Sequence, residues 1–259
     1  MKRKMEVRAL VTCGILIAIA VLLRSFSIMV PIGGAGAMRI GFAGVFIKLP
    51  AILFGATIGG MVSGIVDILA HLIYPKGAYI PFLTITSIIS GILTGLIWNK
   101  VKDMDVRKIE KSYPIFFAIL GVVTVIIHMI IIFSSKSSLI KIKSAFEKKY
   151  LFSLISIEVI VVLAFIVFVL NIKLKNNNIL KNIYENYMKM IITIGIPRII
   201  TTTINTFILL MFIPALQGKN FMFLWVPRVV ESIFMIVFES YLISLLLSAY
   251  KSMNFVITK

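Results

Sequence analysis

The chain has 259 residues, of which 60% are hydrophobic, and its formal net charge is +17. A soluble domain is typically about 45–50% apolar, so this composition excludes an ordinary soluble globular domain. Nucleic-acid binding would require a basic soluble module or stripe, and the sequence contains none. We therefore interpret the 27 Lys and Arg residues, against 10 Asp and Glu, as belonging mainly to basic segments that flank membrane spans.

Long apolar runs determine the expected fold class. A helix needs about 20 apolar residues to cross the hydrocarbon core, and the chain has several such runs, for example residues 190–213. Barrel strands would alternate apolar and polar residues over about 10 positions, whereas these runs are continuous. The sequence predicts an all-α polytopic transmembrane helix bundle, with residues 1–259 forming a single integral membrane domain.

In the first hundred residues we expect four spans. The first covers residues 9–30 and is followed by a Gly-rich loop at 31–39. The apolar stretch 40–74 is too long for one crossing, and we divide it near Thr57 into two short ones. A loop at 75–79 then leads to the fourth span at 80–98.

The rest of the chain alternates between basic segments and further apolar runs, which bring the expected total to eight spans. The predicted spans are 113–133, 150–170, 190–213 and 227–250, separated by basic segments at 99–112, 134–149 and 171–189.

The distribution of Lys and Arg predicts the orientation. A cytoplasmic N-terminus puts most of these residues in the inner segments and both termini inside. The lysine-rich segment 134–149 is an exception, because it is then placed outside. The alternative for this segment is an interfacial amphipathic helix whose lysines reach the headgroups.

Charged and aromatic residues near the outer ends of the spans are candidates for ligand binding. Charge inside a span is costly and indicates function by default, although for Lys48, Arg198 and Glu239 we favour internal pairing or snorkelling to the interface. Outer cations would attract an anionic solute, arginine grips a carboxylate with two hydrogen bonds, and aromatic rings could sandwich a flat ligand. The alternatives are snorkelling to the interface, an aromatic belt and helix–helix hydrogen bonding. The candidate substrate-binding residues are Arg24, Phe26, Arg39, Phe42, Asp67, Lys76, Tyr79, Asn205, Trp225 and Arg228.

Small residues spaced by four lie on one helix face and let helices approach closely. Packing within the bundle is the favoured reading, and docking of a partner's helices is the alternative. The candidate docking residues are Gly14 and Ala18 in the first span and Gly59, Gly60, Ser63 and Gly64 in the third.

Catalytic and metal-binding motifs are missing from the sequence. It has no P-loop, no His-Glu-x-x-His and no Gly-x-Ser-x-Gly pattern, and its two histidines, His71 and His128, lie in separate spans. The single cysteine, Cys13, excludes an internal disulfide, and no cleavable signal is evident. We therefore expect neither an enzyme nor a cofactor or metal site.

Several ordered segments resemble a known family. Residues 37–55, Ile58-Gly-Gly60, Asp67 and Pro75-Lys-Gly-Ala-Tyr-Ile-Pro81, followed by Thr203-Ile-Asn-Thr206, Gly218-Lys219 and Pro227-Arg-Val-Val230, are similar to the folate-type substrate-binding (S) subunits of energy-coupling factor (ECF) transporters. The resemblance covers residues 9–100 and 191–248. It implies a six-helix core at 1–100 and 190–250, interrupted by an insertion at 101–189 that holds two extra spans.

The resemblance also implies a function. Such subunits lie in the bacterial cell membrane, bind a vitamin from outside and associate with a membrane scaffold (T) subunit and two ATPase subunits. Gly14, Ala18 and the small residues at 59–64 would dock the scaffold, and the ligand would be folate. Glu231 departs from the family, which often has a basic residue there. Another vitamin, a queuosine precursor, or a membrane enzyme or scaffold without a transported solute are the alternatives.

Overall fold

The computed structural model describes residues 2–32, 35–75, 77–111 and 178–257, together with residues 166 and 169. The two inserted spans expected at 113–133 and 150–170 lie outside these ranges, so the predicted total of eight spans stays a prediction.

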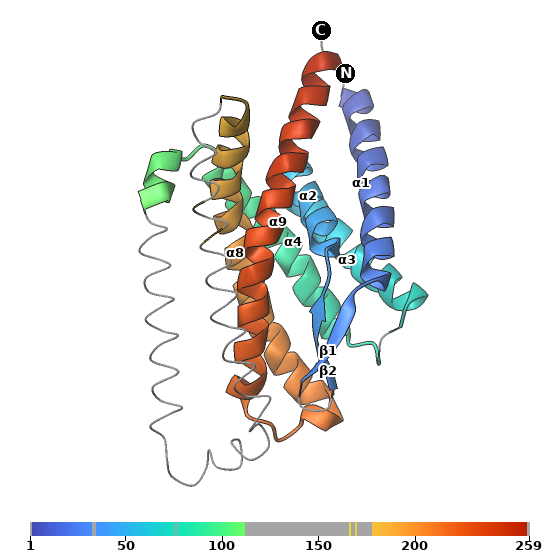
Figure 1. Ribbon diagram of the computed structural model, residues 1–259. Helices are drawn as coiled ribbons and strands as arrows, with labels where there is room; N and C mark the ends of the chain where they lie inside the picture. Colours follow the sequence, from blue (N-terminus) through green and yellow to red (C-terminus); the bar gives the residue numbers. More distant parts are fainter. Residues whose placement is uncertain are drawn as a thin grey trace.

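Helices dominate the described part of the chain (Figure 1). Five of its helices are long and apolar enough to cross a membrane, and α2 is a shorter apolar helix. The predicted all-α polytopic bundle is therefore confirmed. The α-helices of the described residues are α1 (Lys2–Ser25), α2 (Ala43–Phe54), α3 (Ala56–Ile73), α4 (Pro81–Val101), α8 (Asn178–Phe212) and α9 (Phe221–Ile257).

The break between α2 and α3 lies at Gly55, close to the division predicted near Thr57. Gly55 has a φ of 95°, a conformation that glycine adopts without the steric cost a Cβ would bring. The turn folds α3 back against α2, so one apolar stretch becomes two packed helices.

A β-hairpin replaces the end of the predicted first span and the predicted loop at 31–39. Helix α1 ends at Ser25, and strands β1 (Ile28–Ile32) and β2 (Ala35–Ile40) pair antiparallel, with Ile28 opposite Ile40. The prediction was wrong because the apolar residues of β1 continue the hydropathy of α1, and hydropathy alone does not distinguish a strand from the last turns of a helix.

The last two helices begin earlier than residues 190 and 227, where the sequence placed them. The polar first turns of α8 continue as helix because Tyr184, Tyr187 and Met188 are buried against Val101 and Ile109. Tertiary packing therefore extends the helix beyond its apolar part.

The two ends of the bundle differ in what they carry. The N- and C-termini lie together at one end, and the hairpin and the turn between α8 and α9 lie at the other (Figure 1). A core cluster joins α1, α2, α4, α8 and α9 between these ends, through residues that include Leu16, Leu49, Trp98, Ile194 and Ile243. We call the end with the hairpin the hairpin end.

Candidate functional site

An ion pair between α1 and α3 lies near the hairpin. The guanidinium of Arg24 approaches the carboxylate of Asp67 to 2.6 Å, and both side chains are largely buried, at 18% and 14% exposed. A second nitrogen of Arg24 donates to the Val66 carbonyl oxygen at 3.4 Å. The pair neutralises both charges, so Arg24 is held by this chain's own carboxylate.

A line of hydroxyl groups extends from this ion pair into α4. The Thr84 hydroxyl donates to the second Asp67 oxygen at 2.7 Å, and Tyr79 Oη lies 2.9 Å from the same hydroxyl. Since the single proton of Thr84 points to the carboxylate, Tyr79 donates to Thr84. The Tyr79 ring also contacts the ring of His71, with centroids 5.0 Å apart. Arg24, Asp67 and Tyr79, three of the predicted site residues, thus belong to one polar chain.

Arg39 lies on β2, close enough to Arg24 and Asp67 for their charges to affect it. Desolvation and the nearby Arg24 lower the pKa of Arg39, and Asp67 raises it. Its guanidinium donates to the Met29 sulfur at 3.5 Å. Among the described residues no ion pair involves Arg39, so its positive charge is not neutralised by that part of the chain.

Two predicted residues on α8 and α9 make polar contacts between helices. The Thr86 hydroxyl of α4 donates to Asn205 Oδ1 at 2.6 Å, and Trp225 Nε1 donates to the Thr203 hydroxyl at 3.0 Å. Both Asn205 and Trp225 remain partly exposed. Thr84 and Thr86 were missed by the sequence analysis. Two threonines spaced by two in an apolar helix do not indicate a polar site by themselves. Their role becomes clear only from their partners, Asp67 on α3 and Asn205 on α8.

The remaining predicted ligand-binding residues are dispersed. The Phe42 ring packs 5.1 Å from that of Phe238 on α9, whereas Phe26 is 75% exposed and is not brought into the polar chain. Arg228 is half-buried in the second turn of α9. Lys76 lies outside the described residues.

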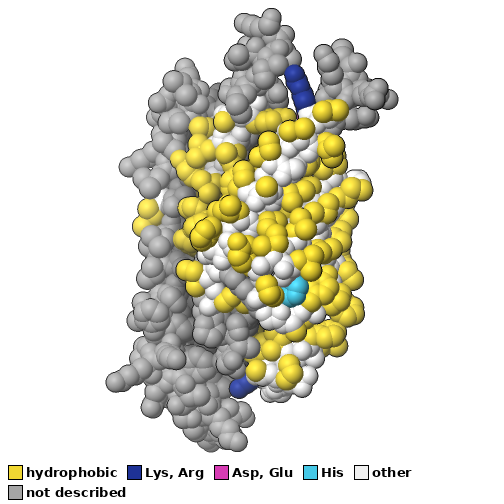
Figure 2. Space-filling model, turned by 90° about the vertical axis from the view of Figure 1, so that its right-hand side faces the viewer, with side chains coloured by type: hydrophobic (Ala, Val, Ile, Leu, Met, Phe, Trp, Pro, Cys, Tyr) yellow, Lys and Arg dark blue, Asp and Glu magenta, His cyan; other side chains and the backbone are white. Residues whose placement is uncertain are grey.

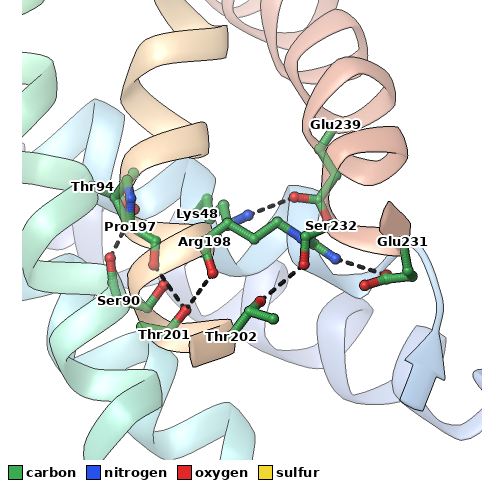
Figure 3. A network of polar contacts seen from close by, with 10 residues as sticks. All are labelled: Lys48, Ser90, Thr94, Pro197, Arg198, Thr201, Thr202, Glu231, Ser232 and Glu239. Atoms are coloured by element: carbon green, nitrogen blue, oxygen red, sulfur yellow. Dashed lines mark hydrogen bonds and ion pairs between the residues drawn. The ribbon is translucent and has the colours of Figure 1, made fainter. Parts of the chain in front are cut away.

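An ion network at mid-bundle joins α2, α8 and α9 (Figure 3). Glu239 accepts from Lys48 at 2.6 Å and from Arg198 at 2.8 Å, and Arg198 also donates to Glu231 at 3.0 Å. A hydrogen bond of 2.9 Å between Thr202 and Ser232 lies beside it. Of the two readings favoured for Lys48, Arg198 and Glu239, internal pairing is the one observed. Glu231, which departs from the family pattern, is neutralised by Arg198.

The small residues of α3 lie inside the bundle, which agrees with packing, the favoured of their two predicted roles. A Cβ on Gly60 would lie 2.6 Å from the Ile92 side chain, and one on Gly64 would lie 2.8 Å from that of Ile88. Gly59 and Ser63 are also buried. Their spacing serves the packing of α3 against α2 and α4, which leaves no exposed surface at these positions.

Gly14 and Ala18 of α1 are placed differently. Both are exposed, and an added Cβ at Gly14 would meet no atom within 4 Å. Large apolar side chains flank them, such as Leu10 at 74% and Leu22 at 57% exposed. A broad hydrophobic surface of this kind covers the face of the bundle shown in Figure 2. Such a face suits lipid or another membrane helix.

The fold and its polar contacts define an integral membrane protein with a helical bundle, an ion network at mid-bundle and a chain of polar side chains from Arg24 to Tyr79 at the hairpin end. The sequence profile of the family described as "ECF-type riboflavin transporter, S component" matches residues 4–176. The chain therefore belongs to this family of membrane S components, which are transporter subunits rather than enzymes. The predicted membership among the S components of ECF transporters is thus confirmed.

The chain is also similar to a curated protein. The folate transporter FolT of Clostridium novyi (strain NT) is 27% identical over 106 residues, which make up 41% of this chain and 54% of the relative. The match thus spans about half the length of that relative. No solved structure matches the chain.

Proposed function

We propose that this S component binds folate or a related anionic pterin from outside the cell. The main support is the charge of Arg39. Asp67 already neutralises Arg24 at 2.6 Å, so Arg39 remains near this pair as a cation available to a ligand carboxylate. Arg39 is exposed, so a ligand carboxylate can reach it, and an arginine can bind a carboxylate through two parallel hydrogen bonds.

Aromatic side chains at the hairpin end suit the flat part of such a ligand. Tyr79 and Phe42 are 44% and 49% exposed, and Trp225 stacks with Phe221 at a centroid distance of 6.0 Å. Partly exposed rings held by hydrogen bonds or ring contacts are preorganised to stack against a pterin. The similarity to a folate transporter points to the same ligand.

Riboflavin is the second candidate, because the family is described by that vitamin. Riboflavin has no carboxylate, so its binding would not require the charge of Arg39 or Arg228. Other vitamins and a queuosine precursor remain further alternatives within transport. Family membership supports all of these over a membrane enzyme or a scaffold without a solute.

Isothermal titration calorimetry on the purified protein separates folate from riboflavin. We expect folate to bind more tightly, and Arg39→Ala and Arg228→Ala each to weaken it by about 10-fold or more, since a hydrogen bond to a charged group contributes about 1.5–3 kcal/mol. Lys100→Ala is the charge-matched control, because Lys100 is exposed in the last turn of α4 at the opposite end. Tighter binding of riboflavin, or unchanged folate binding in both arginine variants, would reject the folate assignment.

We further propose that the protein delivers its ligand through a complex with a membrane scaffold subunit and two ATPase subunits, with both termini in the cytoplasm. The exposed small residues Gly14 and Ala18 support the scaffold contact. Affinity purification of the tagged chain from its native membrane should recover ATPase subunits. Recovery of the chain without them would contradict this assembly.

A further inference from the structure

The ion network at mid-bundle ties three helices together through one carboxylate. Glu239 on α9 is 1% exposed and forms ion pairs with Lys48 of α2 and Arg198 of α8. A buried ion pair often stabilises a fold no more than apolar residues of the same shape would, whereas removing one partner leaves an uncompensated charge. The network therefore need not add to stability, and its ion pairs link α2 and α8 to the same residue of α9.

Gly44 shows how closely α2 approaches this carboxylate. A Cβ on Gly44 would clash with Glu239 Oε1 and would lie 2.8 Å from its Cδ. Lys48, one turn later on the same helix, binds the other oxygen of Glu239 at 2.6 Å. The first half of α2 is thus held against α9 both by an ion pair and by close packing.

The start of α2 also carries part of the candidate site. Phe42, two residues before Gly44, packs against Phe238, which is adjacent to Glu239. Strand β2 contacts α9 directly. At the base of the hairpin, a Cβ on Gly41 would lie 2.8 Å from the Ser27 side chain. A shift of α2 relative to α9 would therefore move Phe42 and the strand that carries Arg39.

We propose that Glu239 is a positioning residue for the ligand site. With Lys48 and Gly44 it fixes the first turn of α2 on α9, and so holds Phe42 and β2 in the geometry that retains a bound vitamin. The inference rests on the proposed function, because it requires a ligand at the hairpin end. No contact between Glu239 and the ligand is implied.

Two variants disturb this attachment in different ways. Glu239→Gln removes the charge that binds Lys48 and Arg198, and Gly44→Ala adds a methyl group against the carboxylate without changing any charge. The matched controls are Glu185→Gln, which changes a carboxylate in the second turn of α8, and Gly195→Ala, whose Cβ would make an ordinary contact with Ile236 at 3.6 Å.

The experiment measures release of radiolabelled folate, and of riboflavin in parallel, from the purified full-length protein. We expect both network variants to release the vitamin about ten times faster with little change in association rate, because changes at a binding site act mainly on dissociation. Both controls should release it at the wild-type rate. Adding Glu239→Gln to a Phe42→Ala background should accelerate release less than Glu239→Gln does alone, since the network acts in part through Phe42.

The outcomes separate the two proposals. Failure of the wild-type protein to retain either vitamin contradicts the proposed function and the inference that depends on it. Retention of a vitamin with unchanged release from Gly44→Ala and Glu239→Gln contradicts the positioning role alone. Acceleration by Glu239→Gln that is as large in the Phe42→Ala background as in the wild type also contradicts the positioning role. If Glu239→Gln does not fold, Gly44→Ala still provides the test.

Discussion

Replacing Gly91 with alanine tests how closely α3 and α4 approach each other. A Cβ at this position would clash with the Gly59 carbonyl oxygen and would lie 2.5 Å from the Ser63 hydroxyl. That hydroxyl donates to the same carbonyl at 2.7 Å. Because ordinary contacts begin at 3.4 Å, the helices must separate locally by at least about 0.9 Å, which a close-packed interior resists.

The size of the effect follows from comparison with Gly195→Ala, where the added Cβ meets Ile236 at 3.6 Å. Both changes gain up to about 1 kcal/mol of helix propensity, and Gly91→Ala alone incurs an overpacking cost of about 1–3 kcal/mol. We therefore expect Gly91→Ala to be less stable than Gly195→Ala by about 1–3 kcal/mol.

Unfolding of both variants in detergent micelles, followed by circular dichroism, measures this difference. At about 3 °C for each kcal/mol in a chain of this size, Gly91→Ala should melt roughly 3–9 °C below Gly195→Ala. Equal melting temperatures would refute the close approach of Gly59 and Gly91. They would also favour the alternative role of these α3 residues, docking of a partner helix.

Three further predictions concern the polar chain and the face of α1. Asp67→Asn should lower the free energy of unfolding by about 1–3 kcal/mol, because it removes the charge that holds Arg24; unchanged denaturant unfolding would contradict the ion pair. Tyr79→Phe should cost about 1 kcal/mol in the same assay, through loss of its hydrogen bond to Thr84; a variant as stable as wild type would count against that bond. Ala18→Leu should leave folate binding intact in calorimetry but reduce recovery of the scaffold subunit on an affinity column, and normal recovery would argue against docking through this face.

The sequence predicted the helices well because membrane spans are encoded in hydropathy, which each segment carries by itself. The turn at Gly55 could also be predicted from the sequence, since the apolar stretch 40–74 is too long to form one crossing. The hairpin at 28–40 was not, because apolar residues before a Gly-rich segment are compatible with either helix or strand. The early start of α8 depends on tertiary packing of Tyr184 and Tyr187, which hydropathy does not report.

The candidate site could be predicted only in part from the sequence. Intramembrane charges marked Arg24, Asp67 and Glu239 as unusual, but their pairings join residues far apart in the chain. Spacing alone also could not show which small residues face outward. Gly14 and Gly60 have similar sequence contexts, yet one is exposed and the other packs against Ile92.

In the function proposed above, Arg39 and the rings around the hairpin hold an anionic vitamin. Mass spectrometry can identify the small molecule retained by the protein when it is purified from cells supplied with both folate and riboflavin. We predict a stoichiometric folate or related pterin carboxylate, which is lost from Arg39→Ala. Retention of riboflavin, or of no small molecule together with no folate binding at micromolar concentration, would contradict the claim.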